Sequence, residues 1–444
     1  MLTAPVHETV LENGLQVLSV DRRASPTATL QLWYRVGSRH ERPGITGVSH
    51  IFEHLMFKGT SRYPKGEFDR LLQENGMTNS AFTSHDFTAY YEVMAADRLE
   101  LAMELESDRM QGLLLDPEEF RAELAVIREE RRQTREDPPF GLLSELVDAS
   151  VFTAHPYHWP VIGWMTDLKT ITLEDVIRYY RDFYRPNNAV LVVVGDRRAE
   201  DVLALARRYF GEIPRGPEIP PVLIREPEQL GERTVSVHKA VQLPGLLIAY
   251  RAPESTHFDA TVLNVLEFIL LHGRSSRLYQ RVIYRDQLAT DVSGGMHTRR
   301  DPSMFTLRAS ARPGVSIETL RDALHEETGR LAREPVTTVE LARARRAIEV
   351  DYVFSQESNY EIAQNLGAEA CRSHWRACVE SLELNLRVTA EDILRVAGEI
   401  FRPTRRTVGL LVPDPDAPSP SRPERSREPV PVPVQVQVPV EAEA

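Results

Sequence analysis

The segment SHIFEHLMFKGT, residues 49–60, places His50, Glu53 and His54 within five positions of an otherwise apolar, helix-like run. On an α-helix, residues four positions apart lie about 40° apart around the axis, so both imidazoles can reach one metal ion. Zinc held in this way keeps an open position, acidifies a bound water, and leaves a neighbouring carboxylate to take the proton. These side chains therefore predict hydrolytic metal chemistry with Glu53 as the general base.

A zinc site of this kind needs a third protein ligand. The charged segment RAELAVIREERRQTRED, residues 121–137, predicts a helix that offers carboxylates. Glu123 and Glu130 are seven positions apart and share one helix face. We predict that Glu130 is the third metal ligand. We predict that Glu123 supports the site without binding the metal itself. Glu129 is the rival ligand, and it points about 100° away from Glu130.

Length and composition restrict the class of protein. The 444 residues exceed what one core organises well, so two domains are expected. A net charge of −12 argues against a nucleic acid as partner, and no run approaches the roughly 20 apolar residues of a membrane span. The N-terminal residues lack a secretion signal, which favours a cytoplasmic protein, or a periplasmic one if a leader has been removed.

The second half of the chain repeats the first, because residues 264–273 align with residues 50–59. The repeat keeps the apolar skeleton without the histidines. The residues that occupy the metal-site positions are Asn264 for His50, Glu267 for Glu53, Phe268 for His54 and Asp351 for Glu130.

Strand-like and helix-like segments are mixed in both halves, which predicts an α+β fold. We expect two homologous mixed α/β-sandwich domains, the second a degenerate copy of the first. The expected divisions are a zinc-bearing domain over residues 1–220, a linker over 221–232, an inactive domain over 233–412 and a disordered, proline-rich tail over 413–444. Apolar periodicity predicts helices over residues 65–74, 97–110, 117–135 and 172–183, and a strand over 188–196.

Several segments resemble the pitrilysin and mitochondrial-processing-peptidase family of zinc peptidases. The matching segments are GSRHERPGITGVSHIFEHLMFKGT, NSAFTSHDFTAYYE, ELAVIREE, HPYHWPVIG and LVVVGD. In that family the third ligand follows the second histidine by about 76 residues, and Glu130 follows His54 by 76 residues here. The resemblance covers residues 8–412 and is closest to the short, two-domain subfamily.

The resemblance implies a zinc metalloendopeptidase with one Zn²⁺ per chain. It assigns His50, His54 and Glu130 as ligands, Glu53 as general base and Glu123 as a helper in catalysis.

It also implies how peptides bind, because the family adds the substrate as a β-strand to the edge strand after the zinc helix. The residues at that position are Ser80, Ala81, Phe82 and Thr83. Pairing through the backbone tolerates many substrate sequences.

One departure from the family concerns a substrate-gripping arginine and tyrosine in the second domain. Their positions hold Ile283 and Thr290. The nearby candidates to replace them are Arg277, Tyr279, Tyr284 and Arg285. Because some short members are heterodimers whose second chain supplies the pair, the resemblance implies that this chain is the zinc-bearing subunit of such a heterodimer. A homodimer is the alternative, and a non-catalytic scaffold subunit of the same fold is the alternative function.

Four further residues could bind metal by type, namely His40, Glu41, His155 and His158. Their spacing fits no site, so we expect satisfied polar side chains instead.

Overall fold

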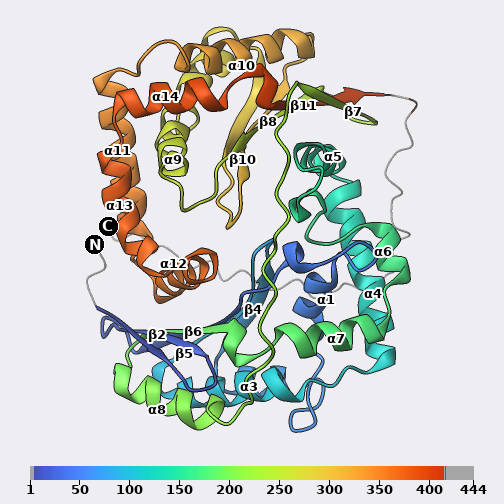
Figure 1. Ribbon diagram of the computed structural model, residues 1–444, viewed down its shortest axis with the longest axis vertical. Coiled ribbons are helices and arrows are strands. Elements are labelled where there is room, and N and C mark those ends of the chain that lie inside the picture. Colours follow the sequence, from blue (N-terminus) through green and yellow to red (C-terminus); the bar gives the residue numbers. More distant parts are fainter. Residues whose placement is uncertain (1–4, 415, 417–444) are drawn as a thin grey trace, which may run out of the picture.

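Two β-sheets organise the chain, and helices cover both of them (Figure 1). The computed structural model describes residues 5–414 and residue 416. The first sheet has six strands in the order β1-β2-β6-β3-β5-β4. Their bounds are β1 Val6–Val10, β2 Gln16–Asp21, β3 Thr27–Tyr34, β4 Thr78–Thr83, β5 Thr88–Ala95 and β6 Ala189–Gly195. Strands β2 and β6 are parallel, the other neighbours are antiparallel, and β4 is an edge strand.

The second sheet has five strands in the order β7-β11-β8-β10-β9. Their bounds are β7 Arg233–Lys239, β8 Gly245–Ala252, β9 Ala289–Met296, β10 Ser303–Ala311 and β11 Arg406–Pro413. Strands β7 and β11 are parallel, and the other neighbours are antiparallel. This pairing repeats the order β2-β6-β3-β5-β4 of the first sheet, so the expectation of two homologous α+β domains is confirmed.

The helices follow the same repeat. In the first domain they are α1 Val48–Leu55, α2 Glu67–Glu74, α3 Leu99–Gly112, α4 Pro117–Arg131, α5 Gly141–Val151, α6 Met165–Thr170, α7 Leu173–Phe183 and α8 Ala199–Phe210. In the second they are α9 Phe258–Leu270, α10 Ile317–Leu331, α11 Thr338–Phe354, α12 Asn359–Arg372, α13 Arg376–Arg387 and α14 Ala390–Ile400. By chain order, α9, α11 and α12 are the counterparts of α1, α4 and α5.

Side-chain caps explain where several helices begin. Thr172 accepts a hydrogen bond from the Asp175 amide at the start of α7, and Thr389 does the same for Asp392 at the start of α14. Such capping boxes satisfy amides that the helix itself leaves free. The predicted helix over 117–135 is α-helical only to Arg131, and it continues as a π-helical turn over Arg132–Glu136.

The two domains exchange one helix each. Helix α12 packs on β3 and β6 of the first sheet, where Leu366 lies among buried residues that include Trp33 (Figure 1). Helix α5 packs on β7, β8 and β11 of the second sheet, where Val147 lies beside Leu411. No helix or strand occurs between α8 and β7. The linker predicted over residues 221–232 therefore connects two domains that each contribute a helix to the sheet of the other.

The predicted tail over residues 413–444 begins inside the second sheet, because Pro413 closes β11 and pairs with β7. Apart from Asp414 and Asp416, the rest of that tail lies outside the described residues. Within the residues that the structure describes, no helix is long and apolar enough to cross a membrane.

Candidate metal centre

The start of α1 is fixed by a buried carboxylate. Glu41 accepts hydrogen bonds from the amides of Gly47, at 2.7 Å, and Ser49, at 2.8 Å. A carboxyl group at this place satisfies amides that the helix itself leaves free. Burial raises the pKa of Glu41 to about 8, although both amide bonds act in the opposite direction. Gly47 must be glycine, because its φ is 92° and a Cβ would lie 2.6 Å from the Ile162 carbonyl oxygen.

The apolar face of α1 sets its rotation. Ile51, Phe52 and Leu55 are buried in the first core. The Phe52 ring lies 4.8 Å from the Tyr184 ring, and Tyr90 donates its hydroxyl to the Phe52 carbonyl oxygen at 3.1 Å. Anchoring this face turns His50 and His54 towards α4.

Helix α4 supplies the carboxylates. It begins at Pro117, after Asp116 accepts hydrogen bonds from the amides of Glu118 and Glu119. Glu123 and Glu130 lie on the face that meets α1. Glu129 pairs instead with Arg132 at 2.9 Å, on the exposed side of the helix.

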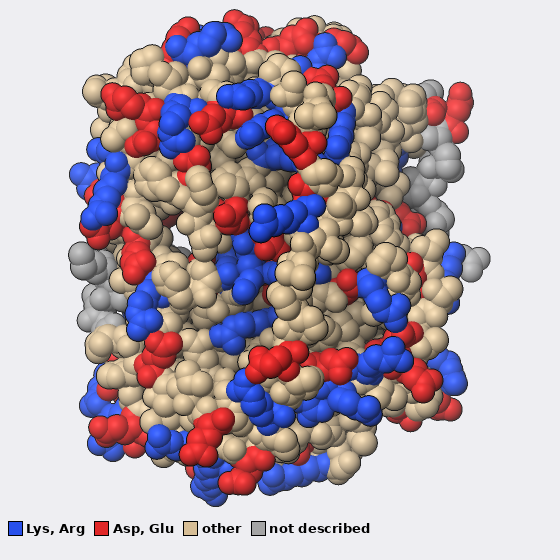
Figure 2. Space-filling model, in the orientation of Figure 1, with Lys and Arg blue, Asp and Glu red and all other residues tan. Residues whose placement is uncertain are grey.

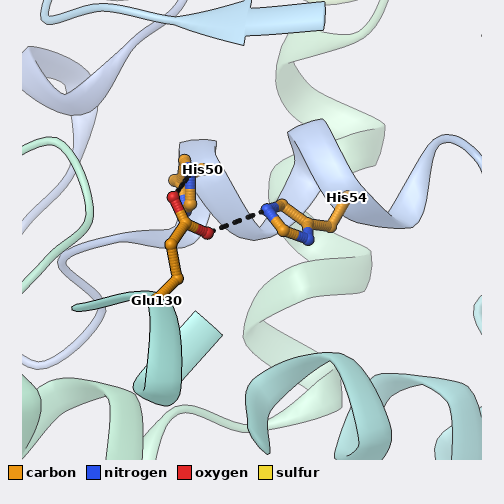
Figure 3. Close-up of side chains that lie close together, drawn as sticks. All are labelled: His50, His54 and Glu130. Atoms are coloured by element: carbon orange, nitrogen blue, oxygen red, sulfur yellow. Dashed lines mark ion pairs between the residues drawn. The ribbon is translucent and has the colours of Figure 1, made fainter. Parts of the chain in front are cut away.

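The side chains of His50, His54 and Glu130 converge from the two helices (Figure 3). Glu130 places Oε1 3.4 Å from His50 Nε2, and Oε2 3.4 Å from His54 Nε2. One ligand atom from each residue lies within 4.8 Å of the other two. Two ligand atoms of a tetrahedral zinc ion with bonds of about 2.0–2.1 Å are roughly 3.3–3.4 Å apart. The donor set therefore fits one zinc ion.

Glu123 orients the second histidine. Its Oε2 lies 3.2 Å from His54 Nδ1, and its Oε1 lies 2.5 Å from Lys58 Nζ. In the tautomer that carries its proton on Nδ1, His54 donates to Glu123 and leaves Nε2 free for a metal. His50 has no such support, because its Nδ1 is buried without a hydrogen-bond partner among the described side chains and backbone.

The electrostatics of the group favour positive charge at its centre. Burial alone would lower the pKa of His54, but Glu123 and Glu130 outweigh it and raise the pKa to about 9. Burial would raise the pKa of Glu130, but His50 and His54 outweigh it and lower the pKa to about 2. Burial likewise opposes the lowering of the Glu123 pKa by His54 and Lys58. Two carboxylates that stay ionised beside two imidazoles suit a divalent cation.

Glu53 is half-buried on the same helix. Its carboxylate has no hydrogen bond or ion pair with any described residue. Burial raises the pKa of Tyr90 and Tyr184, and the charge of Glu53 adds a smaller contribution to both. Glu53 is thus a carboxylate next to the two histidines that no described residue engages, so it can accept a proton from a substrate or a water molecule.

The edge strand β4 runs alongside the metal helix. Ser80, Ala81, Phe82 and Thr83 pair with β5 on one side, and α1 packs against β4. Ala81 lies opposite Tyr90, which holds the Phe52 carbonyl oxygen of α1. The Phe82 ring meets the Trp33 ring edge-on at 5.3 Å, so its side chain anchors the strand.

Ile283 and Thr290 stand in the second domain at the two positions where the resemblance places the substrate-gripping arginine and tyrosine. Ile283 packs against the second core, and Thr290 donates to Asp291 at 3.0 Å. The four nearby candidates differ in how they are placed. Arg277 pairs with Glu340 at 2.7 Å, and Arg285 donates to the Gln280 carbonyl oxygen. The Tyr284 side chain is 68% exposed, and Tyr279 is half-buried.

The remaining histidines lie outside the centre. His40 Nδ1 accepts from the Gly37 amide at 3.3 Å, and His155 pairs with Asp301 at 3.1 Å. His158 Nδ1 lies 2.9 Å from the His155 carbonyl oxygen. Glu41 is a satisfied polar side chain, as expected, because it accepts from the amides of Gly47 and Ser49. Sequence reasoning missed Lys58, which contacts Glu123. The only signal for Lys58 was its place four residues after His54.

The counterpart positions in the second domain hold no metal-binding group. Asn264 donates to Asn385 Oδ1 at 2.9 Å, and Glu267 accepts from the Met296 amide at 2.8 Å. Phe268 stacks on His272. His50, His54 and Glu130 form the one such group among the residues described.

Comparison with known proteins gives the family. Residues 16–163 match the family described as insulinase (peptidase family M16), and residues 170–348 match the peptidase M16 inactive domain. The zinc protease PqqE of Helicobacter pylori is 32% identical over 414 residues, which cover 92% of this chain and 93% of that protein. This chain belongs to peptidase family M16.

Other M16 relatives agree over nearly the whole chain. An uncharacterized zinc protease of Streptomyces coelicolor, SCO5738, is 27% identical and covers 91% of this chain and 90% of its own length. The crystal structure of a protease from Helicobacter pylori superimposes with a TM-score of 0.90 at 30% identity, covering 92% of this chain and all of that chain. The periplasmic protease PqqL of Escherichia coli shares the fold, with a TM-score of 0.76 at 18% identity, and this chain covers 48% of it. The predicted family and fold are confirmed.

Proposed function

We propose that this M16 chain is a zinc-dependent endopeptidase that hydrolyses peptides or unfolded segments at internal bonds. The observation that carries the proposal is the convergence of His50, His54 and Glu130 beside Glu53, which has no hydrogen bond or ion pair with the residues that the structure describes. When bound, zinc would supply a Lewis acid that polarises the scissile carbonyl and lowers the pKa of a water molecule.

The residues of the chain divide the work. His50, His54 and Glu130 would hold the ion. Glu53 takes a proton from the attacking water as the water oxygen bonds to the carbonyl carbon. It then returns the proton to the amide nitrogen as the C–N bond breaks. Glu123 is a positioning residue, because it acts through the His54 ring.

We propose that substrates pair with the outer edge of β4 along Ser80–Thr83. Two observations support this: β4 pairs with β5 alone, and α1 packs against it. Backbone pairing would draw an extended peptide past the metal helix without demanding a particular sequence. Folded proteins protect most of their edge strands, which favours peptides and unfolded segments as substrates.

The missing arginine and tyrosine support a second subunit. We propose that a homologous chain supplies them in a heterodimer, with a homodimer as the alternative. The same gap, at Ile283 and Thr290, supports a second candidate function, a non-catalytic scaffold subunit. The cytoplasmic location expected from the sequence stays a prediction, with the periplasm as its alternative.

The test is cleavage of a mixed pool of internally quenched peptides by the purified chain, with and without a zinc chelator, followed by zinc add-back. Chelator-sensitive cleavage that returns with zinc supports the endopeptidase and shows that the chain is active alone. A zinc-loaded chain that is inactive alone, and active after a homologous subunit is added, supports the heterodimer. A chain that binds no zinc contradicts the proposal.

A further inference from the structure

A pocket of about 190 Å³ lies where β4 ends, between the two domains. The residues that line it are Ser84, His85, Asp86, Phe87, His297, Thr298, Arg299 and Arg372. The first four form the connection from β4 to β5, the next three follow β9, and Arg372 ends α12. The pocket therefore continues the proposed peptide-binding edge and has walls from both domains.

Arg299 gives the pocket a buried positive charge. Its side chain is 8% exposed, and its guanidinium lies 4.7 Å from the centre of the Tyr157 ring. It forms no ion pair with the described residues, and its Nη1 is buried without a hydrogen-bond partner among them. A buried guanidinium without a counter-charge is costly, so an anion that enters the pocket would gain a strong partner.

Arg372 adds a second guanidinium. Its Nη1 is paired with Glu369 at 2.7 Å, and the group lies 5.4 Å from the centre of the Phe87 ring. Its Nε is buried without a partner within the described part of the chain. Glu369 thus neutralises the charge of Arg372, but it does not use all the N–H donors of the Arg372 guanidinium.

Asp86 is the one carboxylate in the lining, and other groups already hold it. It accepts from the Tyr157 hydroxyl at 2.6 Å and from the Arg300 amide at 3.0 Å, and it faces Arg39 at 3.8 Å. Its charge is therefore shared with partners other than Arg299. Asp148 acts on Arg299 only from beyond ion-pair distance.

The histidines of the pocket do not add to its charge at neutral pH. Burial, helped by Arg299, lowers the pKa of His297 to about 4 and lowers the pKa of His85 well below its ordinary value. One ring nitrogen of each is engaged, His85 Nδ1 with Ser38 at 2.7 Å and His297 Nε2 with Thr306 at 3.0 Å. The net charge of the lining comes from Arg299.

The pocket lies within reach of a bound peptide. Ala81 is opposite Tyr90, which contacts α1, and His85 follows Ala81 by four residues. An extended strand advances about 3.4 Å per residue, so these four residues, the last two of which lie beyond β4, span at most about 14 Å. A peptide that is cut beside α1 would therefore place at the pocket a group that lies four or five positions from the scissile bond. Figure 2 shows Lys and Arg side chains gathered in the hollow between the domains.

Resting on the proposed function, we propose that this pocket binds a carboxylate of the peptide substrate and so selects anionic peptides. The carboxylate is an Asp or Glu side chain four or five positions from the scissile bond, or the free C-terminus of the peptide. Both present the same planar anion, for which a guanidinium is the matching donor.

The experiment measures binding, so that it does not depend on turnover. The zinc-loaded chain carrying Glu53→Gln is titrated into fluorescent neutral peptides in which one Glu is stepped along the sequence. Each peptide that contains Glu is compared with the peptide that has Gln at the same position. Peptides with a free C-terminal carboxylate are compared with the same peptides carrying a C-terminal amide. We expect a preference of about ten- to a hundred-fold for the carboxylate in one register, because hydrogen bonds to charged groups are worth that much.

Further variants, made in the same background, assign the preference to the pocket. Arg299→Gln should reduce the ratio of the affinities for the carboxylate peptide and its neutral counterpart to nearly one. Arg372→Gln should reduce this ratio in part. Thr298→Ala, in the same lining, should keep it. Arg299→Lys keeps the charge without the fork and should retain part of the preference, which covers the case in which Arg299→Gln fails to fold.

The outcomes separate the sources and the hypotheses. A preference that follows the stepped Glu identifies a side chain, and one that follows the terminal acid identifies the C-terminus. Equal binding of all pairs, no binding of any peptide, or a preference unchanged in Arg299→Gln overturns the inference. Cleavage by the unmodified chain is measured separately, so a failure of the endopeptidase proposal is seen on its own.

Discussion

The two domains offer an internal comparison, because the same helix pair holds two different sites. In the first domain α1 and α4 bring His50, His54 and Glu130 together. In the second, α9 and α11 carry Asn264 and Asp351 at two of the counterpart positions, and both line a cavity of about 420 Å³. The apolar positions maintain the fold in both, whereas a few polar side chains decide the chemistry.

The difference is also one of charge. The first site assembles carboxylates and imidazoles whose pKa values shift in opposite directions, so it gains from a cation. The second uses a neutral amide pair, Asn264 with Asn385, and a ring stack of Phe268 on His272. Glu267 remains at the position of Glu53, yet it is occupied by the Met296 amide. Glu267 is thus held by the backbone of β9, whereas Glu53 has no such partner among the described residues.

Removing a metal ligand should have the largest effect. His50→Ala should lower the zinc content from about one ion per chain to nearly none and abolish cleavage, because a ligand is lost. The matched change in the second domain, Asn264→Ala, should keep zinc and activity. Metal analysis after dialysis checks both, and full zinc content in His50→Ala would exclude His50 as a ligand.

Removing the base should have the next largest effect. Glu53→Gln should keep zinc and lower turnover by about 10²–10⁴-fold, because general-base catalysis is lost. Glu267→Gln keeps an acceptor oxygen for the Met296 amide and should leave turnover unchanged. Initial rates on a quenched peptide compare the two, and wild-type turnover in Glu53→Gln would show that another group is the base.

Weakening the support of His54 should have an intermediate effect. Glu123→Gln removes the charge that faces His54 Nδ1 and Lys58, and it should lower zinc affinity by about 10–100-fold. Glu129→Gln, on the exposed side of the same helix, is the control and should bind zinc normally. Competition with a chelator of known affinity measures both. Equal affinities would mean that Glu123 does not support the site.

The smallest effect concerns packing between the domains. A Cβ at Gly367 on α12 would lie 2.2 Å from the Trp33 indole, so Gly367→Ala should destabilise the fold by about 1–3 kcal/mol. At Gly398 on α14 the nearest atom is 3.7 Å away, so Gly398→Ala should be neutral or stabilising by up to about 1 kcal/mol. Thermal unfolding orders the two variants, and equal melting temperatures would contradict the close contact of α12 with the first sheet.

Local features could be predicted from the sequence. His50 and His54 share one helix turn, and Glu123 and Glu130 share one helix face. Their spacing in the sequence was therefore enough to predict which side chains lie together on each helix. The repeat at residues 264–273 predicted a second domain of the same α+β type. Whether these residues bind metal and turn over peptides stays a prediction.

Contacts between distant segments could not be predicted. The exchange of α5 and α12 and the meeting of His85 with Arg299 both depend on tertiary packing. No periodicity of one segment encodes which other segment will cover it. The same reason hid the Lys58 contact with Glu123, because Lys58 lies just after α1 and Glu123 lies on α4.

The helix exchange has a consequence for how the halves could be produced. Each half carries a helix that completes the core of the other, through Leu366 over Trp33 and Val147 beside Leu411. A chain interrupted near Leu223, which is 80% exposed and lies between α8 and β7, would keep both of these cores. The two fragments, expressed as separate polypeptides, should therefore recognise each other and reassemble as a complementing pair.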